Sequence, residues 1–212
     1  MKKPFSLILS LALSASIAGC AADSGARNTA DSFLNALETG DLDGAIAVSD
    51  GTAREGVEAL KASTLAIFQF PEGFEISDEM QAVMDEFVRG STAISYKSHK
   101  IWNMKRISDD EYEVTAIVTI ADSQSLADAI AAVDPQSDIN TYADEINEIT
   151  LNEGEDAGFA RMMFVIYDCY NRNMDEIESH LRFEDGSIIM TLKKNKDGNW
   201  TVSDIPTDSQ SD

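Results

Sequence analysis

The spacing of apolar residues changes from a helical to a strand-like period near the middle of the chain. In residues 30–88 apolar side chains recur every three or four positions, which predicts helices. Gly40 is expected to end the first helix, and a short segment follows at 41–48. The capping box Thr52–Glu55 is expected to open the next helix, and Ser77 to cap a third.

Alternating apolar and polar positions predict two pairs of strands. The first pair spans residues 93–107 and 112–120, and its alternation slips near His99, which predicts a bulge. The second pair spans residues 187–193 and 200–205 around an Asp-Gly turn. Four strands in two hairpins predict an antiparallel sheet.

About sixty residues between the two hairpins again have helical spacing. Residues 122–181 contain three apolar stripes, and the methionines of the chain stand at core spacing, which favours core packing over a ligand groove. The pattern predicts an α+β fold: N-terminal helices packed on a curved antiparallel sheet of about four strands, with a helical insertion between the two hairpins. No linker or repeat interrupts this region, so residues 28–205 are expected to form one domain and 206–212 a polar tail.

The first residues have the features of a secretory signal peptide. Lys2 and Lys3 give a positive start, and an apolar stretch follows over residues 5–18. This stretch is shorter than the roughly 20 residues that span a bilayer as a helix. A cleaved signal peptide is therefore expected over residues 1–19.

Residues 17–20 carry a more specific motif. They read Ile-Ala-Gly-Cys and resemble the lipobox of bacterial lipoproteins. The resemblance implies a diacylglyceryl group and fatty acids such as palmitate on Cys20, followed by a short tether, so that residues 20–27 separate the lipid from the domain. It also implies that the protein is held on the extracytoplasmic face of the cell membrane.

The charge excludes one class of function. The chain has 16 Lys and Arg against 38 Asp and Glu, a net charge of −22, and nucleic acids require clustered basic residues. Removal of Lys2 and Lys3 leaves 14 basic against 38 acidic residues, a charge of −24, which an anionic lipid surface repels. We expect the membrane to be bound through the lipid on Cys20 alone.

Few residues suggest chemistry. His99 and Asp31 could serve a catalytic site, but no spacing gives His99 a partner. Cys169 lies on an apolar stripe and is expected to be a buried thiol, while His180 is expected at a helix end. The acidic loop at Asp41 lacks a full set of calcium ligands. We therefore expect no cofactor, no metal site and no enzymatic activity.

Both ends of the domain carry recognisable features. At residues 33–45 an apolar helix ends at a Gly-Asp pair and a short helix follows, and residues 188–205 form a hairpin with Trp after the turn glycine. These features resemble lipoproteins with a nuclear-transport-factor-2-like (cystatin-like) domain. The resemblance implies a pocket between helix and sheet, with Phe33, Trp102 and Tyr112 as candidate lining residues, and a homodimer formed through the sheet.

Three functions remain open at this point. The first is a non-catalytic binding module for a small apolar ligand or an envelope protein, with a pocket around Trp102 and Tyr112. The second is a structural or interaction protein without a pocket, whose sheet is covered by the helices of residues 122–181. The third is a small isomerase or hydratase, which would need an ionisable residue buried in the pocket.

The lipobox assignment makes a direct prediction. Cys20→Ser removes the thiol that accepts the lipid, so the precursor is expected to remain uncleaved and to incorporate no labelled fatty acid. Metabolic labelling with radioactive palmitate checks this, and acylation of the variant would contradict the assignment.

Overall fold

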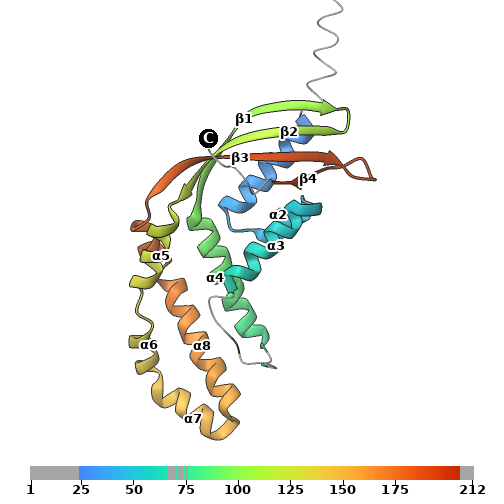
Figure 1. Ribbon diagram of the computed structural model, residues 1–212. Coiled ribbons are helices and arrows are strands. Elements are labelled where there is room, and N and C mark those ends of the chain that lie inside the picture. Colours follow the sequence, from blue (N-terminus) through green and yellow to red (C-terminus); the bar gives the residue numbers. More distant parts are fainter. Residues whose placement is uncertain (1–23, 66–69, 71–73, 75, 206–212) are drawn as a thin grey trace, which may run out of the picture.

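A curved antiparallel sheet covers the N-terminal helices of the protein (Figure 1). The computed structural model describes residues 24–65, 70, 74 and 76–205. Its four strands lie in the order β1-β2-β3-β4 and are β1 Tyr96–Ser108, β2 Glu111–Ala121, β3 Phe183–Lys194 and β4 Trp200–Asp204. The predicted α+β class, the antiparallel pairing and the turn at Gly198 are confirmed.

The inner face of the sheet follows from alternation along β2. Tyr112, Val114, Ala116 and Val118 are buried, whereas the intervening residues are partly exposed. In β1 the register slips on either side of His99, between Tyr96 and Ser98 and again after Ile101. The irregularity predicted from the broken alternation is therefore confirmed.

Three helices pack beneath this face. They are a helix over residues 24–38, α2 Leu42–Ala47 and α3 Gly51–Leu65. The first helix ends at Gly40, which has a φ of 69°, and the Asp41 carboxylate caps α2 by accepting from the Gly44 amide at 2.9 Å.

Two predictions about this region are wrong. The helix α3 already begins at Gly51, and the Thr52 hydroxyl donates to the Ser203 carbonyl in β4 at 3.3 Å instead of capping the helix. Tertiary contact with the sheet thus replaces the local capping box. Residues 24–27, predicted as part of a tether over 20–27, are helical.

The helix α4 Asp78–Ser95 joins the helical layers to the sheet. Its N-terminus is capped as predicted, because the Ser77 hydroxyl accepts from the Met80 amide at 3.2 Å. Residues 93–95, predicted to begin the first strand, form its last turn. The reason is a tertiary contact. Ile94 is buried against Ala129 and Ile177, and this burial outweighs the β-type composition of the segment.

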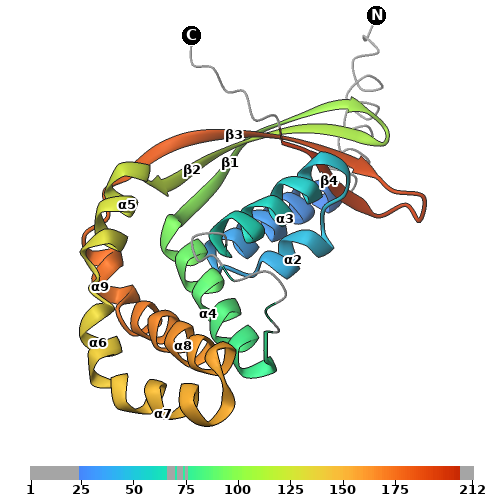
Figure 2. The same cartoon turned by 60° about the horizontal axis from the view of Figure 1, so that its bottom comes forward.

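The predicted helical insertion lies between β2 and β3 (Figures 1 and 2). It comprises α5 Ser123–Ala132, α6 Gln136–Thr141, α7 Ala143–Glu153, α8 Glu155–Arg172 and α9 Met174–Ser179. The second predicted stripe is divided at Tyr142 and the third at Asn173. The insertion packs on α4 and on itself, so the hypothesis that it covers the sheet is wrong.

Three hydrophobic clusters hold the fold together, and α4 contributes to each. Val88 belongs to the cluster beneath the sheet, Phe87 to the cluster between α4 and α8, and Ile94 to the one shared with α5 and α9. The second cluster contains buried methionines, as expected from their core spacing: Met80, Met84 and Met163. All members of the three clusters lie between Ala26 and Ile205, so residues 21–212 include every core contact found among the described residues.

The turn after the first helix yields a stability prediction. A Cβ at Gly40 would lie 2.0 Å from the Arg89 carbonyl oxygen of α4, and the φ of +69° is unfavourable for other residues. Gly40→Ala is expected to lower the free energy of unfolding by at least about 2 kcal/mol in urea denaturation.

The matched control is Gly56→Ala in α3. A Cβ at this position meets no atom within 4 Å. Alanine favours a helix interior by roughly 0.5–1 kcal/mol over glycine, so this variant is expected to be as stable as the wild type or more so. Equal destabilisation of the two variants would contradict the role assigned to Gly40.

Candidate functional site

An apolar groove lies between the N-terminal helices and the C-terminal hairpin. Its volume is about 460 Å³, within the range of small-molecule sites. The first helix, α3 and the two hairpins contribute its walls: Phe33, Leu37, Thr52, Ala53, Gly56, Val57, Leu60, Tyr96, Ile188, Asp204 and Ile205. We call this cavity the groove.

Polar groups occur at only a few places in the groove. Asp204 is held by a hydrogen bond from the Thr52 hydroxyl, which joins α3 to the end of β4. Tyr96 starts β1, and burial raises the pKa of its phenol. A neutral phenol and one carboxylate on an otherwise largely apolar wall suit the binding of an apolar molecule.

Only one of the three predicted pocket residues lines the groove. Phe33 does so, with 1% of its surface exposed. Tyr112 is buried in the sheet core, where its ring packs edge-on against Trp200 with centroids 5.3 Å apart. Trp102 is 67% exposed, because it follows the buried Ile101 in β1 and its side chain therefore points to the opposite, outer face of the sheet.

Most residues of the groove were not predicted from the sequence. Its long wall is one face of α3, from Ala53 to Leu60, and the facing residues Ile188 and Ile205 come from the other end of the chain. The available signal was Gly56, a small residue within the apolar face of a helix. A Cβ there would point into open space.

His99 has carboxylate partners that its spacing did not reveal. Its Nδ1 lies 2.6 Å from Oε1 of Glu38, and its Nε2 lies 3.4 Å from Oδ1 of Asp31. Both carboxylates belong to the helix over residues 24–38, so the imidazole links that helix to β1. Both ring nitrogens face acceptor oxygens, and the side chain is only 11% exposed.

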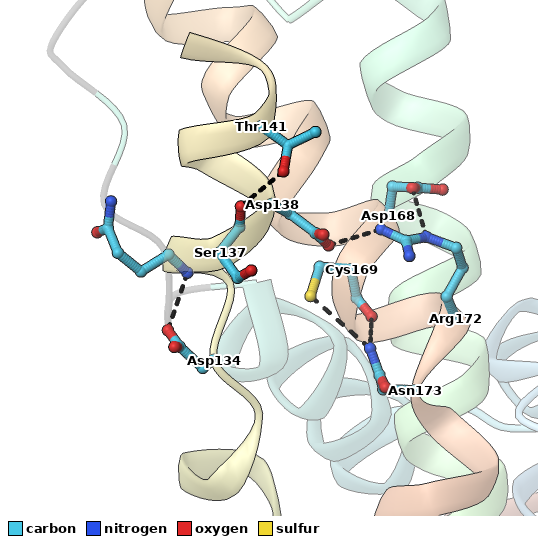
Figure 3. Close-up of polar contacts among 9 residues, drawn as sticks. Asp134, Ser137, Asp138, Thr141, Asp168, Cys169, Arg172 and Asn173 are labelled. Carbon is cyan, nitrogen blue, oxygen red and sulfur yellow. Dashed lines mark hydrogen bonds and ion pairs between the residues drawn. The ribbon is translucent and has the colours of Figure 1, made fainter.

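A second polar cluster surrounds Cys169 in the helical insertion (Figure 3). Arg172 of α8 donates from Nη2 to Asp138 of α6 at 2.6 Å and from Nε to Asp168 at 2.8 Å. The Asn173 side chain donates from Nδ2 to the Cys169 carbonyl at 2.7 Å. The Cys169 thiol and the Arg172 guanidinium hold the pKa of Asp138 below its usual range.

Cys169 is buried, as the sequence predicts, and is a poor nucleophile. Burial and the hydrogen bond to Asp138 raise the pKa of its thiol to about 11. Thiolate is therefore rare at neutral pH. A cavity of about 260 Å³ reaches this cluster, and His180, the C-cap of α9 as expected, lies on its wall.

The described residues show neither a metal cluster nor a membrane-spanning helix. No group of three or more His, Cys, Asp and Glu side chains in this part of the chain is arranged to hold a metal ion. Among the helices that the structure describes, none combines the length and apolarity needed to cross a bilayer. Cys20 lies outside the described residues.

Comparisons with known proteins show no family for this chain. No family profile matches the chain, and no curated protein sequence matches it. The chain is similar to the crystal structure of a lipoprotein candidate, ycdA, from Bacillus subtilis, with 16% identity and a TM-score of 0.37. The match covers 74% of this chain and 45% of that one, so this chain spans less than half of ycdA. A likeness of this size carries no argument about fold or function.

The Cys169 cluster makes a prediction about pH. Since the thiol pKa is raised to about 11, the alkylation rate of residues 21–212 by iodoacetamide is expected to be very low at pH 8 and to rise only towards pH 11. Asp138→Asn removes a carboxylate that raises this pKa, so the rate at pH 8 is expected to increase.

The control for this experiment is Asp134→Asn. Asp134 lines the same cavity, but its carboxylate accepts from the Gln136 amide and not from the thiol. This variant is expected to react as slowly as the wild type. Native alkylation at pH 8 as fast as that of the urea-unfolded chain would show the prediction to be wrong.

Proposed function

We propose that the protein is a lipid-anchored, extracytoplasmic binding module that captures a small apolar ligand in the groove and has no catalytic activity. The groove is the observation that carries the proposal. Its volume of about 460 Å³ and largely apolar walls match the general form of small-molecule sites. The proposal includes the nuclear-transport-factor-2-like class suggested by the two ends of the domain.

The anchoring part of the proposal rests on the sequence and on the start of the first helix. Residues 17–20 match a lipobox, and the described chain is helical from residue 24. Processing before Cys20 would leave residues 21–23 as a link, about 10 Å when extended. The groove would then stay close to the outer surface of the membrane.

The state of the ionisable groups supports a non-catalytic role. The Cys169 thiol stays protonated at neutral pH, and both nitrogens of His99 are engaged by carboxylates. Neither group lines the groove. The groove offers Asp204 as its charged side chain, and the hydroxyl of Thr52 is bonded to it.

One observation favours a second candidate function, the binding of an envelope protein. Trp102 and Ile107 of the edge strand β1 are 67% and 49% exposed, and Ile189 of β3 is 44% exposed. Exposed tryptophan is frequent at the centre of protein interfaces. This surface is also the place for a homodimer through the sheet, which stays a prediction.

Filling the groove tests the proposed function. Gly56→Phe places a ring in the open space at this position, so it is expected to abolish binding of the uncharged fluorescent probe N-phenyl-1-naphthylamine to residues 21–212. The wild type is expected to bind the probe with enhanced, saturable fluorescence. Native mass spectrometry of the same preparations is expected to show added mass on the wild type only.

The control is Ala62→Phe, which adds the same ring to an exposed position of α3 that lines none of the described cavities. Its probe binding is expected to equal that of the wild type. If the wild type binds no probe, or if Gly56→Phe binds it equally well, the groove is not the ligand site. If the wild type shows only the mass of the unliganded protein and also binds a specific protein partner, the second candidate function is favoured.

A further inference from the structure

The groove has an extension that the proposed function does not use. A second cavity of about 150 Å³, here called the rear cavity, shares Leu60 and Tyr96 with the groove as lining residues. Its other walls come from α3, α4 and α5, and include Thr64, Phe87, Ser95 and Ile130. Because two side chains belong to both walls, the cavities are adjacent.

The lining of the rear cavity is largely apolar. Three of its hydroxyl groups donate within their own helices: Thr64 donates to the Leu60 carbonyl at 3.0 Å and Ser95 to the Ser91 carbonyl at 2.7 Å. Ser91 likewise donates to the Phe87 carbonyl at 2.8 Å. With these donors engaged, the cavity offers a polar ligand few partners, whereas an alkyl chain requires none.

Charge in the two cavities has one sign. Asp204 lines the groove, and no Lys, Arg or His is among the described residues that line either cavity. The surrounding domain is strongly acidic, with 38 Asp and Glu in the chain against 16 Lys and Arg. A bound carboxylate or phosphate would therefore have no cationic partner here, while a cationic group would have Asp204.

From this arrangement we propose that the ligand is a single-chain amphiphile with a cationic head group. Its head lies in the groove beside Asp204, and its alkyl chain passes Leu60 and Tyr96 and ends in the rear cavity between α3, α4 and α5. This inference rests on the proposed function and specifies its ligand class. A compact apolar molecule would occupy the groove alone and leave the rear cavity empty.

A chain-length series tests the path of the alkyl chain. Alkyltrimethylammonium ions of six to fourteen carbons, kept below their micelle concentration, compete with N-phenyl-1-naphthylamine for residues 21–212. The affinity is expected to increase by about fourfold for each buried methylene until both cavities are filled, and then to level off. Thr64→Leu narrows the rear cavity, so it is expected to move this levelling-off to shorter chains while the shortest members bind as before.

The matched control is Ser63→Leu, at the neighbouring position of α3. Ser63 is exposed and lines neither cavity. Its chain-length profile is expected to equal that of the wild type. Levelling-off at the same length in Thr64→Leu and the wild type would overturn the proposed path.

The head group is tested at one chain length. The wild type is expected to bind dodecyltrimethylammonium about fivefold or more tightly than dodecanoate, since two opposite charges about 4 Å apart in water are worth about that factor. Asp204→Asn can keep the Thr52 hydrogen bond and is expected to remove the preference. Equal binding of the two amphiphiles by the wild type would overturn the cationic head group.

The outcomes for the ligand class and for the binding site can be told apart. If the probe binds but no amphiphile displaces it with a dependence on chain length, the groove remains a ligand site and this inference fails. If the probe itself does not bind, the proposed function fails as well.

Discussion

The fold depends on one helix, α4, which contributes a buried side chain to each of three hydrophobic clusters. The helix α4 gives Val88 to the cluster beneath the sheet, Phe87 to the cluster with α8, and Ile94 to the cluster with α5 and α9. At 18 residues it is about 27 Å long, enough to pass from the sheet into the insertion. The insertion can therefore interrupt the chain between β2 and β3 without covering the sheet, because its helices have α4 to pack on.

The local signals in the sequence were sufficient to predict individual elements. Ser77 caps α4, Gly40 ends the first helix, and the alternation in β2 identifies the buried face. These features depend on residues within a few positions of one another. The predictions for Thr52 and for residues 93–95 failed because partners far away in the chain, in β4 and in the insertion, decided the outcome.

The candidate site was harder to predict for the same reason. Phe33 was expected at the pocket because it lies on the first apolar helix, and it lines the groove. Trp102 was expected there for its place on the first hairpin, but it follows the inward-facing Ile101 and so lies on the outer face of the sheet. The Glu38 carboxylate beside His99 lies 61 residues earlier in the chain and Asp31 earlier still, so no local spacing could reveal them.

The junction of α4 and β1 has a mechanical consequence. Ser95 ends the helix and Tyr96 begins the strand, so no loop separates the two elements. Tyr96 also stands on the wall of both cavities. A rotation of α4, such as pressure on the insertion would produce, would be transmitted without a hinge to the side chain at which the groove meets the rear cavity. Force applied to the far end of the molecule would thus shift a side chain that both cavity walls share.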